Sequence, residues 1–325
     1  MHGGQKLPHP LRVLAVERIT ANKARYIKLG DTGRWEELAF EEGFIPLQYQ
    51  NVPHEIAVTL DKNKIRNCLI ADGKVPRSAS DHTRQILDFY TLDETTLWIT
   101  FTSNYLCWCF AEPGVIPSQP DEIAIKGHRY RRVRGAWHNT NLRGEPLYLT
   151  GISGDLAKKG MYRQTICDIY PDQLEYLLRK INGEEQEVVK EATRARQALL
   201  ASIESLMKLL QPADFEVLVD LVFSQSGWRR LGAVGGVKKT SDMELELPST
   251  GERAFIQVKS DTRQSELDAY VKQLKTRGDA RMFFAYHTCK GELACVNSQV
   301  ILLGPQRLSE MVLGAGLFDW LMQKV

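Results

Sequence analysis

The feature that most constrains the fold of this chain is a long stretch, residues 184–210, that contains neither glycine nor proline. Glutamate, lysine, arginine, alanine, glutamine and leucine dominate it, and these residues favour helices. We therefore expect one long helix that ends before Gln211-Pro212, because proline interrupts helical hydrogen bonding. A chain of 325 residues is long enough for two domains. The stretch predicts a connecting helix between two domains, and it also offers a contact for a homodimer.

The hydropathy pattern and the cysteines exclude several classes of protein. No stretch approaches about 18 consecutive apolar residues, the length that spans a membrane. The amino-terminal residues lack a long apolar segment after a basic start, which argues against a secretory signal. The six cysteines form no C-x-x-C pair, so we expect reduced thiols rather than a zinc site. We expect a cytoplasmic protein with no membrane partner.

The first half, residues 1–170, predicts a β-rich domain. Residues 97–111 are rich in aromatic and β-branched residues and are interrupted by Ser103-Asn104, which is typical of a hairpin. Residues 25–29, 130–133 and 146–150 are further strand candidates, and residues 35–42 have a helical pattern.

A basic segment lies near the end of this half. Residues 126–143 hold six basic residues and no acidic one, with Tyr130 and Trp137 between them. Such a segment suits a phosphate backbone. It equally suits a solvated strand edge protected by charge, and both interpretations stay open. The candidate phosphate contacts are Arg129, Arg131, Arg132 and Arg134.

The second half predicts an α/β domain. Residues 171–181 carry leucines at helical spacing, and with the long helix they form an expected helical linker over 171–211. Residues 212–325 then follow the order α-β-β-α-β-β-α. This order indicates a central mixed sheet flanked by helices.

The candidate metal-binding and catalytic residues lie on two predicted strands joined by a turn at 248–251. Alternation places Asp242, Glu244 and Glu246 on one face of the first strand, and Gln257 with Lys259 on one face of the second. If the strands pair, Asp242 approaches Gln257 and Lys259. An oxygen-rich cluster beside a lysine suits Mg²⁺ together with a phosphate. The alternative is an edge strand whose glutamine and lysine are simply solvated.

The order of motifs in this half matches a known family. The motifs are Phe215-Glu216 on a helix, glycines between 232 and 236, Asp242 at a strand start, and Gln257-Val258-Lys259 on the next strand. This order resembles the Mrr-like branch of the PD-(D/E)xK restriction-endonuclease superfamily. Tyr270 and Gln273 resemble the Tyr and Gln positions of the following helix in related nucleases. The resemblance covers residues 212–325 and implies a restriction-endonuclease-like fold.

The resemblance also implies roles. Asp242 would be the principal ligand of Mg²⁺ or Mn²⁺, Gln257 would replace the usual acid, Glu216 would supply a further carboxylate, and Lys259 would be catalytic. Tyr270 and Gln273 would contact the substrate. A neutral amide binds Mg²⁺ more weakly than a carboxylate, so Glu216 or Glu244 must compensate.

A nuclease of this kind needs a domain that selects its DNA. Aromatic residues in the first half could hold a base by stacking, and the half resembles the PUA/EVE-like domains fused to modification-dependent nucleases. Trp35 follows a turn among charged residues and is the candidate base contact, although each tryptophan also suits a core position.

These observations predict a Mg²⁺-dependent endonuclease for double-stranded DNA, of restriction or anti-phage type, that acts as a homodimer and could require modified bases. One alternative is a catalytically decayed nuclease fold that serves as a DNA-binding or regulatory module. Another is a nuclease directed at RNA.

Overall fold

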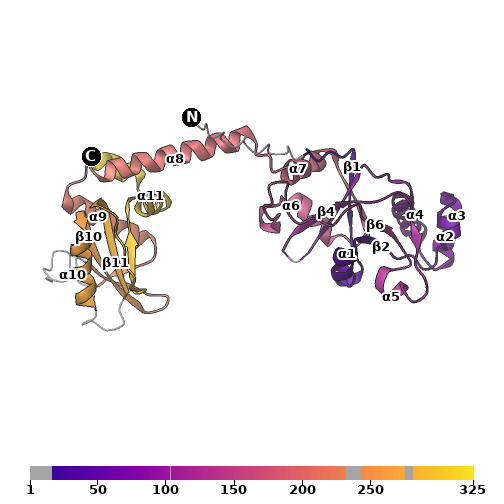
Figure 1. The fold of residues 1–325 in the computed structure, drawn as a ribbon, viewed down its shortest axis with the longest axis horizontal. Helices are drawn as coiled ribbons and strands as arrows, with labels where there is room; N and C mark the ends of the chain where they lie inside the picture. The colour runs from indigo at the N-terminus through magenta and orange to yellow at the C-terminus, as the bar shows by residue number, and fades with distance from the viewer. Residues whose placement is uncertain (1–16, 103, 232–242, 275–280) are drawn as a thin grey trace, which may run out of the picture. The chain divides into compact units, whose positions relative to one another are not determined.

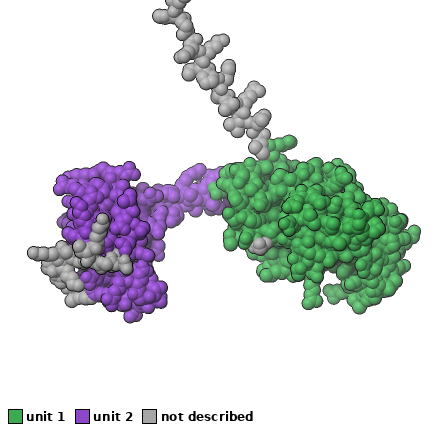
Figure 2. All heavy atoms as spheres, turned by 60° about the horizontal axis from the view of Figure 1, so that its bottom comes forward, with its two compact units in different colours: residues 1–185 green, residues 186–325 purple. Residues whose placement is uncertain are grey.

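The computed structural model describes residues 17–102, 104–231, 243–274 and 281–325 (Figure 1). The chain divides into two compact units between Glu185 and Gln186 (Figure 2). The helical segment expected as a linker is therefore shared between them. Helix α7 (Pro171–Ile181) packs into the core of unit 1, and α8 (Glu187–Met207) contributes Ile203 and Met207 to the core of unit 2. Among the described residues, no helix combines the length and apolarity that crossing a membrane requires.

The larger sheet of unit 1 is mixed. Its four described strands have the order β4-β3-β1-β7. They are β1 (Lys23–Ile27), β3 (Thr96–Phe101), β4 (Leu106–Phe110) and β7 (Ile166–Ile169). Strands β3 and β4 pair antiparallel, which confirms the predicted hairpin. Strand β1 pairs parallel with β3 and antiparallel with β7. The carboxyl ends of β1 and β3 therefore meet the start of β7 at one edge.

A smaller antiparallel sheet accompanies it. Its described strands are β2 (Phe44–Leu47), β6 (Arg129–Arg132) and β5 (Ile116–Pro117), in that order. Side chains from both sheets and from a neighbouring helix share one hydrophobic core, which includes Ile27, Phe44, Phe89 and Trp98.

The first half is less β-rich than the sequence pattern predicts. Its further helices and turns are α1 (Glu36–Glu42), α2 (His54–Ala57), α3 (Lys62–Ala71), α4 (Pro76–Thr91), α5 (Ile123–Lys126), α6 (Gly154–Ala157) and the 3-10 turns Asp31–Gly33, Leu149–Gly151 and Lys158–Met161. The expectation of a mostly β half is wrong for residues 54–91. Two local signals mark these helices: the Asp61 side chain accepts hydrogen bonds from the first turn of α3, and Pro76 occupies the first turn of α4.

Gln85 ties helix α4 to the start of β7. Its buried Oε1 accepts hydrogen bonds from the backbone N–H groups of Thr165 and Ile166, both at 2.9 Å, and Tyr49 donates to it at 3.2 Å. This one side chain therefore satisfies main-chain donors at the edge of the sheet.

Replacing Gln85 by leucine is expected to destabilise unit 1 by roughly 2–3 kcal/mol, because the buried N–H group of Ile166 and the partly buried one of Thr165 lose their acceptor. Chemical denaturation monitored by circular dichroism measures the change. The matched control is Gln50→Leu, since Gln50 is exposed. Equal stabilities of the two variants would contradict the anchoring role.

Unit 2 is built on a mixed sheet, as the element order predicts. Its five described strands have the order β12-β11-β10-β9-β8. They are β8 (Arg229–Arg230), β9 (Met243–Leu247), β10 (Glu252–Arg263), β11 (Arg281–Lys290) and β12 (Val300–Leu303). Strands β9 and β10 form an antiparallel hairpin, whereas β10, β11 and β12 run parallel.

Helices cover both faces of this sheet. Helices α8, α9 (Pro212–Gln225), α11 (Pro305–Gly314) and α12 (Phe318–Lys324) pack on the face that presents Ala254, Ile256 and Val258. Helix α10 (Gln264–Leu274) packs on the other face, beside Phe255. The predicted closing helix is in fact two helices, because Gly316 adopts a φ of 69° between them and ends α11.

Candidate functional site

Gln257 and Lys259 share one face of β10. Strand alternation places them with Phe255, on the side that α10 covers. Gln257 is only 2% exposed, and Lys259 is half-buried. The structure thus confirms that both residues lie on one strand and on one of its faces, with Gln257 buried and Lys259 partly accessible.

Tyr270 of α10 completes this face. The Lys259 Nζ lies 5.6 Å from the centre of the Tyr270 ring, within the range of a cation–π contact. The Tyr270 ring in turn packs 6.0 Å from that of Phe284, on the neighbouring strand β11. Gln273 is exposed on the same helix. Lys259 is therefore positioned by an aromatic wall that leaves its ammonium group partly accessible.

The pairing of β9 with β10 stops just short of these residues. The last described pair is Met243 with Ile256, and Glu244 lies opposite Phe255. Gln257 is the next residue of β10. Asp242, the expected principal metal ligand, lies outside the described residues.

Glu216 lies on the other side of the sheet. It is an exposed residue of α9, whose apolar residues Phe215 and Val219 pack against Ile256 and Val258. Gln257 and Lys259 face away from that helix. Glu216 as a further metal ligand remains a prediction.

The described residues supply only part of a magnesium site. Among them, no group of three or more aspartate, glutamate, histidine or cysteine side chains is close enough to hold a metal ion. Mg²⁺ usually keeps several waters and needs only one or two protein carboxylates. The donors present on this face of the hairpin are the Gln257 amide and the carboxylate of Glu244, and they fit such a site only with a further ligand such as Asp242.

Two of the expected phosphate contacts are structural. Arg129 and Arg131 are each 2% exposed. Arg129 donates to the carbonyl oxygens of Tyr49 and Val52, and Arg131 donates to those of Glu112 and Leu92 at 2.9 and 2.7 Å. The expectation that these two arginines contact phosphates is wrong, because main-chain oxygens inside unit 1 already use their donors.

Arg132 and Arg134 differ from their neighbours. Both are exposed, and the Arg134 guanidinium lies 5.1 Å from the centre of the Phe110 ring. They remain candidate phosphate contacts. Alternate arginines of the basic segment are thus turned inward and outward, and only the outward pair keeps the two interpretations of the sequence open.

Trp35 is buried, contrary to expectation. It is 3% exposed, its Nε1 donates to the Ala124 carbonyl oxygen at 2.9 Å, and the Arg34 guanidinium lies 4.3 Å from its ring centre. Its ring nevertheless lines a pocket of about 530 Å³. Trp35 therefore shapes the wall of a cavity and is not an exposed stacking surface.

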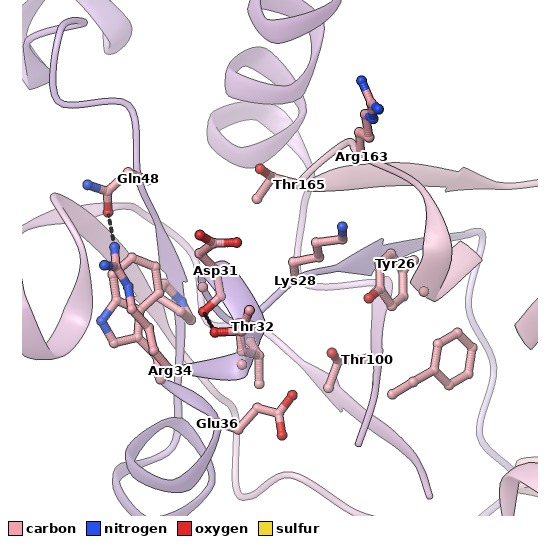
Figure 3. Close-up of a pocket in the computed structure, with 17 residues that line it drawn as sticks. Tyr26, Lys28, Asp31, Thr32, Arg34, Glu36, Gln48, Thr100, Arg163 and Thr165 are labelled. Carbon is pink, nitrogen blue, oxygen red and sulfur yellow. Dashed lines mark hydrogen bonds between the residues drawn. The ribbon is translucent and has the colours of Figure 1, made fainter. Parts of the chain in front are cut away.

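This pocket lies at the edge where β1 and β3 end and β7 begins (Figure 3). Lys28 directly follows β1, Thr100 is the second-last residue of β3, and Thr165 directly precedes β7. No sequence pattern marks these residues as a group, because each is an ordinary polar residue in its own segment. The parallel pairing of β1 with β3, which joins residues more than 70 positions apart, brings them together.

Comparison of the chain with protein-family models, with curated proteins and with solved structures gave no match. Function is therefore inferred from the chemistry of the two sites.

Proposed function

We propose that the protein is a Mg²⁺-dependent endonuclease that hydrolyses phosphodiester bonds of double-stranded DNA, in restriction or anti-phage defence. The observation that supports this proposal is the arrangement of Gln257, Lys259 and Tyr270 on one face of unit 2, directly beyond the described end of the β9–β10 pairing.

The half-buried position of Lys259 favours an anionic ligand. An ammonium group that loses water is costly unless an anion compensates it. A scissile phosphate would provide that anion, and Lys259 would stabilise the charge that builds up on its oxygens. Bound Mg²⁺ would offset the same charge and lower the pKa of a coordinated water. Gln257 and Asp242 are the residues proposed to hold the ion.

In this proposal unit 1 selects the DNA. Its exposed Arg132 and Arg134 would contact phosphates, which positions the duplex without reading its sequence. Base selection requires a different part of the unit.

The proposal is tested by incubating the full chain with plain, methylated and hydroxymethylated DNA, each with Mg²⁺ and with EDTA. At least one DNA is expected to be cut with Mg²⁺ and none with EDTA. Asp242→Ala should abolish that cleavage and leave DNA binding in EDTA unchanged, because its carboxylate is assigned to the metal alone. RNA incubated in parallel tests whether the chain cuts RNA instead of DNA. Undiminished DNA cleavage by Asp242→Ala would refute the assignment of Asp242 to the metal.

The second candidate is a nuclease fold without catalysis that binds DNA for a regulatory purpose. The position of Glu216 favours it, because the helix that carries this carboxylate packs on the face of the sheet opposite Gln257. Tight DNA binding with no cleavage of any polymer in Mg²⁺ or Mn²⁺ would establish this candidate instead.

A further inference from the structure

The pocket beside Trp35 has the position and size of a ligand site. Open α/β sheets bind ligands at the carboxyl ends of their parallel strands, and β1 and β3 end at this pocket. Its volume of about 530 Å³ lies within the range of roughly 300–1,000 Å³ that small-molecule sites occupy. The residues around it are polar and apolar in mixture, so the ligand must offer both kinds of surface.

Lys28 supplies a positive charge to the pocket. Its side chain is half-buried and extends into the pocket between Asp31 and Tyr26 (Figure 3). Within the described part of the chain, its ammonium group forms no hydrogen bond or ion pair, and neither does the guanidinium of Arg163 at the rim.

Two other partly buried cations of unit 1, in contrast, are paired. Arg25 contacts Asp88 and Asp168 at 2.9 and 3.2 Å, and Lys126 contacts Glu42 and Glu122 at 3.1 and 3.3 Å. The charge of Lys28 is therefore available to an anionic group of a ligand.

On the opposite side of the pocket lie polar groups suited to hydrogen bonds with the edge of a planar ring of a ligand. The Glu36 carboxylate points toward Thr100 (Figure 3). The Glu36 side chain is partly withdrawn from water, and this burial raises the pKa of its carboxyl group. Elsewhere in the pocket, the amide of Gln48, which accepts from Arg34 at 3.4 Å, adds a further polar group.

We propose that this pocket binds one nucleotide unit, with Lys28 on its phosphate and Glu36 with Thr100 on the polar edge of its base. The ligand carries one anionic group and one flat, partly apolar ring with donors and acceptors on its edge, which matches the charge at Lys28 and the mixed opposite wall. The choice of a nucleotide over other phosphorylated compounds rests on the proposed function. The unit comes either from a free nucleotide or from DNA whose base has turned out of the duplex.

Calorimetric titration of the full chain in EDTA tests this proposal. The probes are inorganic phosphate, the four deoxynucleoside 5′-monophosphates, 5-methyl-dCMP, and duplexes with and without one unpaired base. At least one mononucleotide is expected to bind more than tenfold tighter than inorganic phosphate. Tighter binding of the duplex with the unpaired base than of both the paired duplex and the free nucleotide assigns the site to DNA. Binding of free nucleotides alone assigns it to a soluble effector.

Lys28→Ala is expected to weaken nucleotide binding at least tenfold, whereas Lys23→Ala, which removes an exposed lysine at the start of β1, should leave it unchanged. Glu36→Gln keeps the shape of the side chain and should change the ranking of the bases by fivefold or more. If Lys28→Ala does not fold, Glu36→Gln carries the test.

Three results would overturn the proposal: no saturable binding of any mononucleotide or unpaired base, phosphate binding as tight as nucleotide binding, or affinities unaffected by Lys28→Ala and Glu36→Gln. Because EDTA removes the metal, loss of nucleotide binding and loss of cleavage are measured separately. A chain that binds nucleotides but never cuts DNA would refute the proposed function and retain this inference.

Discussion

Replacing Lys259 by alanine is expected to lower the rate of Mg²⁺-dependent DNA cleavage at least about 100-fold, the effect typical of removing one preorganised group that stabilises transition-state charge. The ammonium group lies on the same face as Gln257, and Tyr270 holds it 5.6 Å from its ring centre. Lys259 is the only cation among the residues assigned to this site. Its substitution therefore removes the positive charge proposed to stabilise the bound phosphate. Single-turnover cleavage of labelled DNA measures the effect.

Two further variants make this test specific. Lys272→Ala removes an exposed lysine from α10 and should leave the cleavage rate within about twofold of the parent protein. Lys259→Arg keeps the charge but replaces a compact ammonium by a planar group, so it should recover only part of the rate. Cleavage by Lys259→Ala at the parent rate would remove this lysine from the catalytic assignment, and DNA binding in EDTA confirms that the variant still folds.

Replacing Arg131 by alanine is expected to destabilise unit 1 by roughly 3–5 kcal/mol. The substitution removes a buried side chain and leaves the carbonyl oxygens of Glu112 and Leu92 without their donor. For a unit of this size such a loss lowers the melting temperature by roughly 10 °C. Differential scanning calorimetry measures the melting temperature. If the two units unfold separately, the substitution should shift only the transition of unit 1.

The adjacent residue provides the control. Arg132→Ala removes the same charge from an exposed position and should change stability by less than about 0.5 kcal/mol. It should instead weaken DNA binding and reduce the salt dependence of binding by about one phosphate contact. Equal melting temperatures for the two variants would show that the buried hydrogen bonds of Arg131 do not stabilise the unit.

The elements of unit 2 could be predicted because their signals are local. Helix α9 begins at Pro212, where a proline suits the first turn, and its apolar residues recur at helical spacing. Strand β12 coincides with a short apolar run, residues 300–303. In unit 1 the same kind of local evidence was present for α3 and α4, at Asp61 and Pro76.

The candidate sites differ in how far the sequence could predict them. The pairing of Gln257 with Lys259 on one face follows from alternation along a single strand and needed no tertiary information. The position of Glu216 required the tertiary structure. The face of the sheet that helix α9 covers depends on which apolar residues of β10 its own apolar residues pack against. The pocket at Lys28 was not predictable, since β1 and β3 are far apart in the sequence and only their parallel pairing joins their ends.

The sequence by itself determined where helices and strands of unit 2 occur and which side chains share a strand face, because propensity, capping and alternation act over a few residues. The tertiary structure alone decided which charged groups are buried. Arg131 and Arg132 are neighbours of the same type, yet one is enclosed by main-chain carbonyls from distant segments and the other is exposed. Burial of a charge depends on partners supplied by the rest of the fold, and no local pattern encodes them.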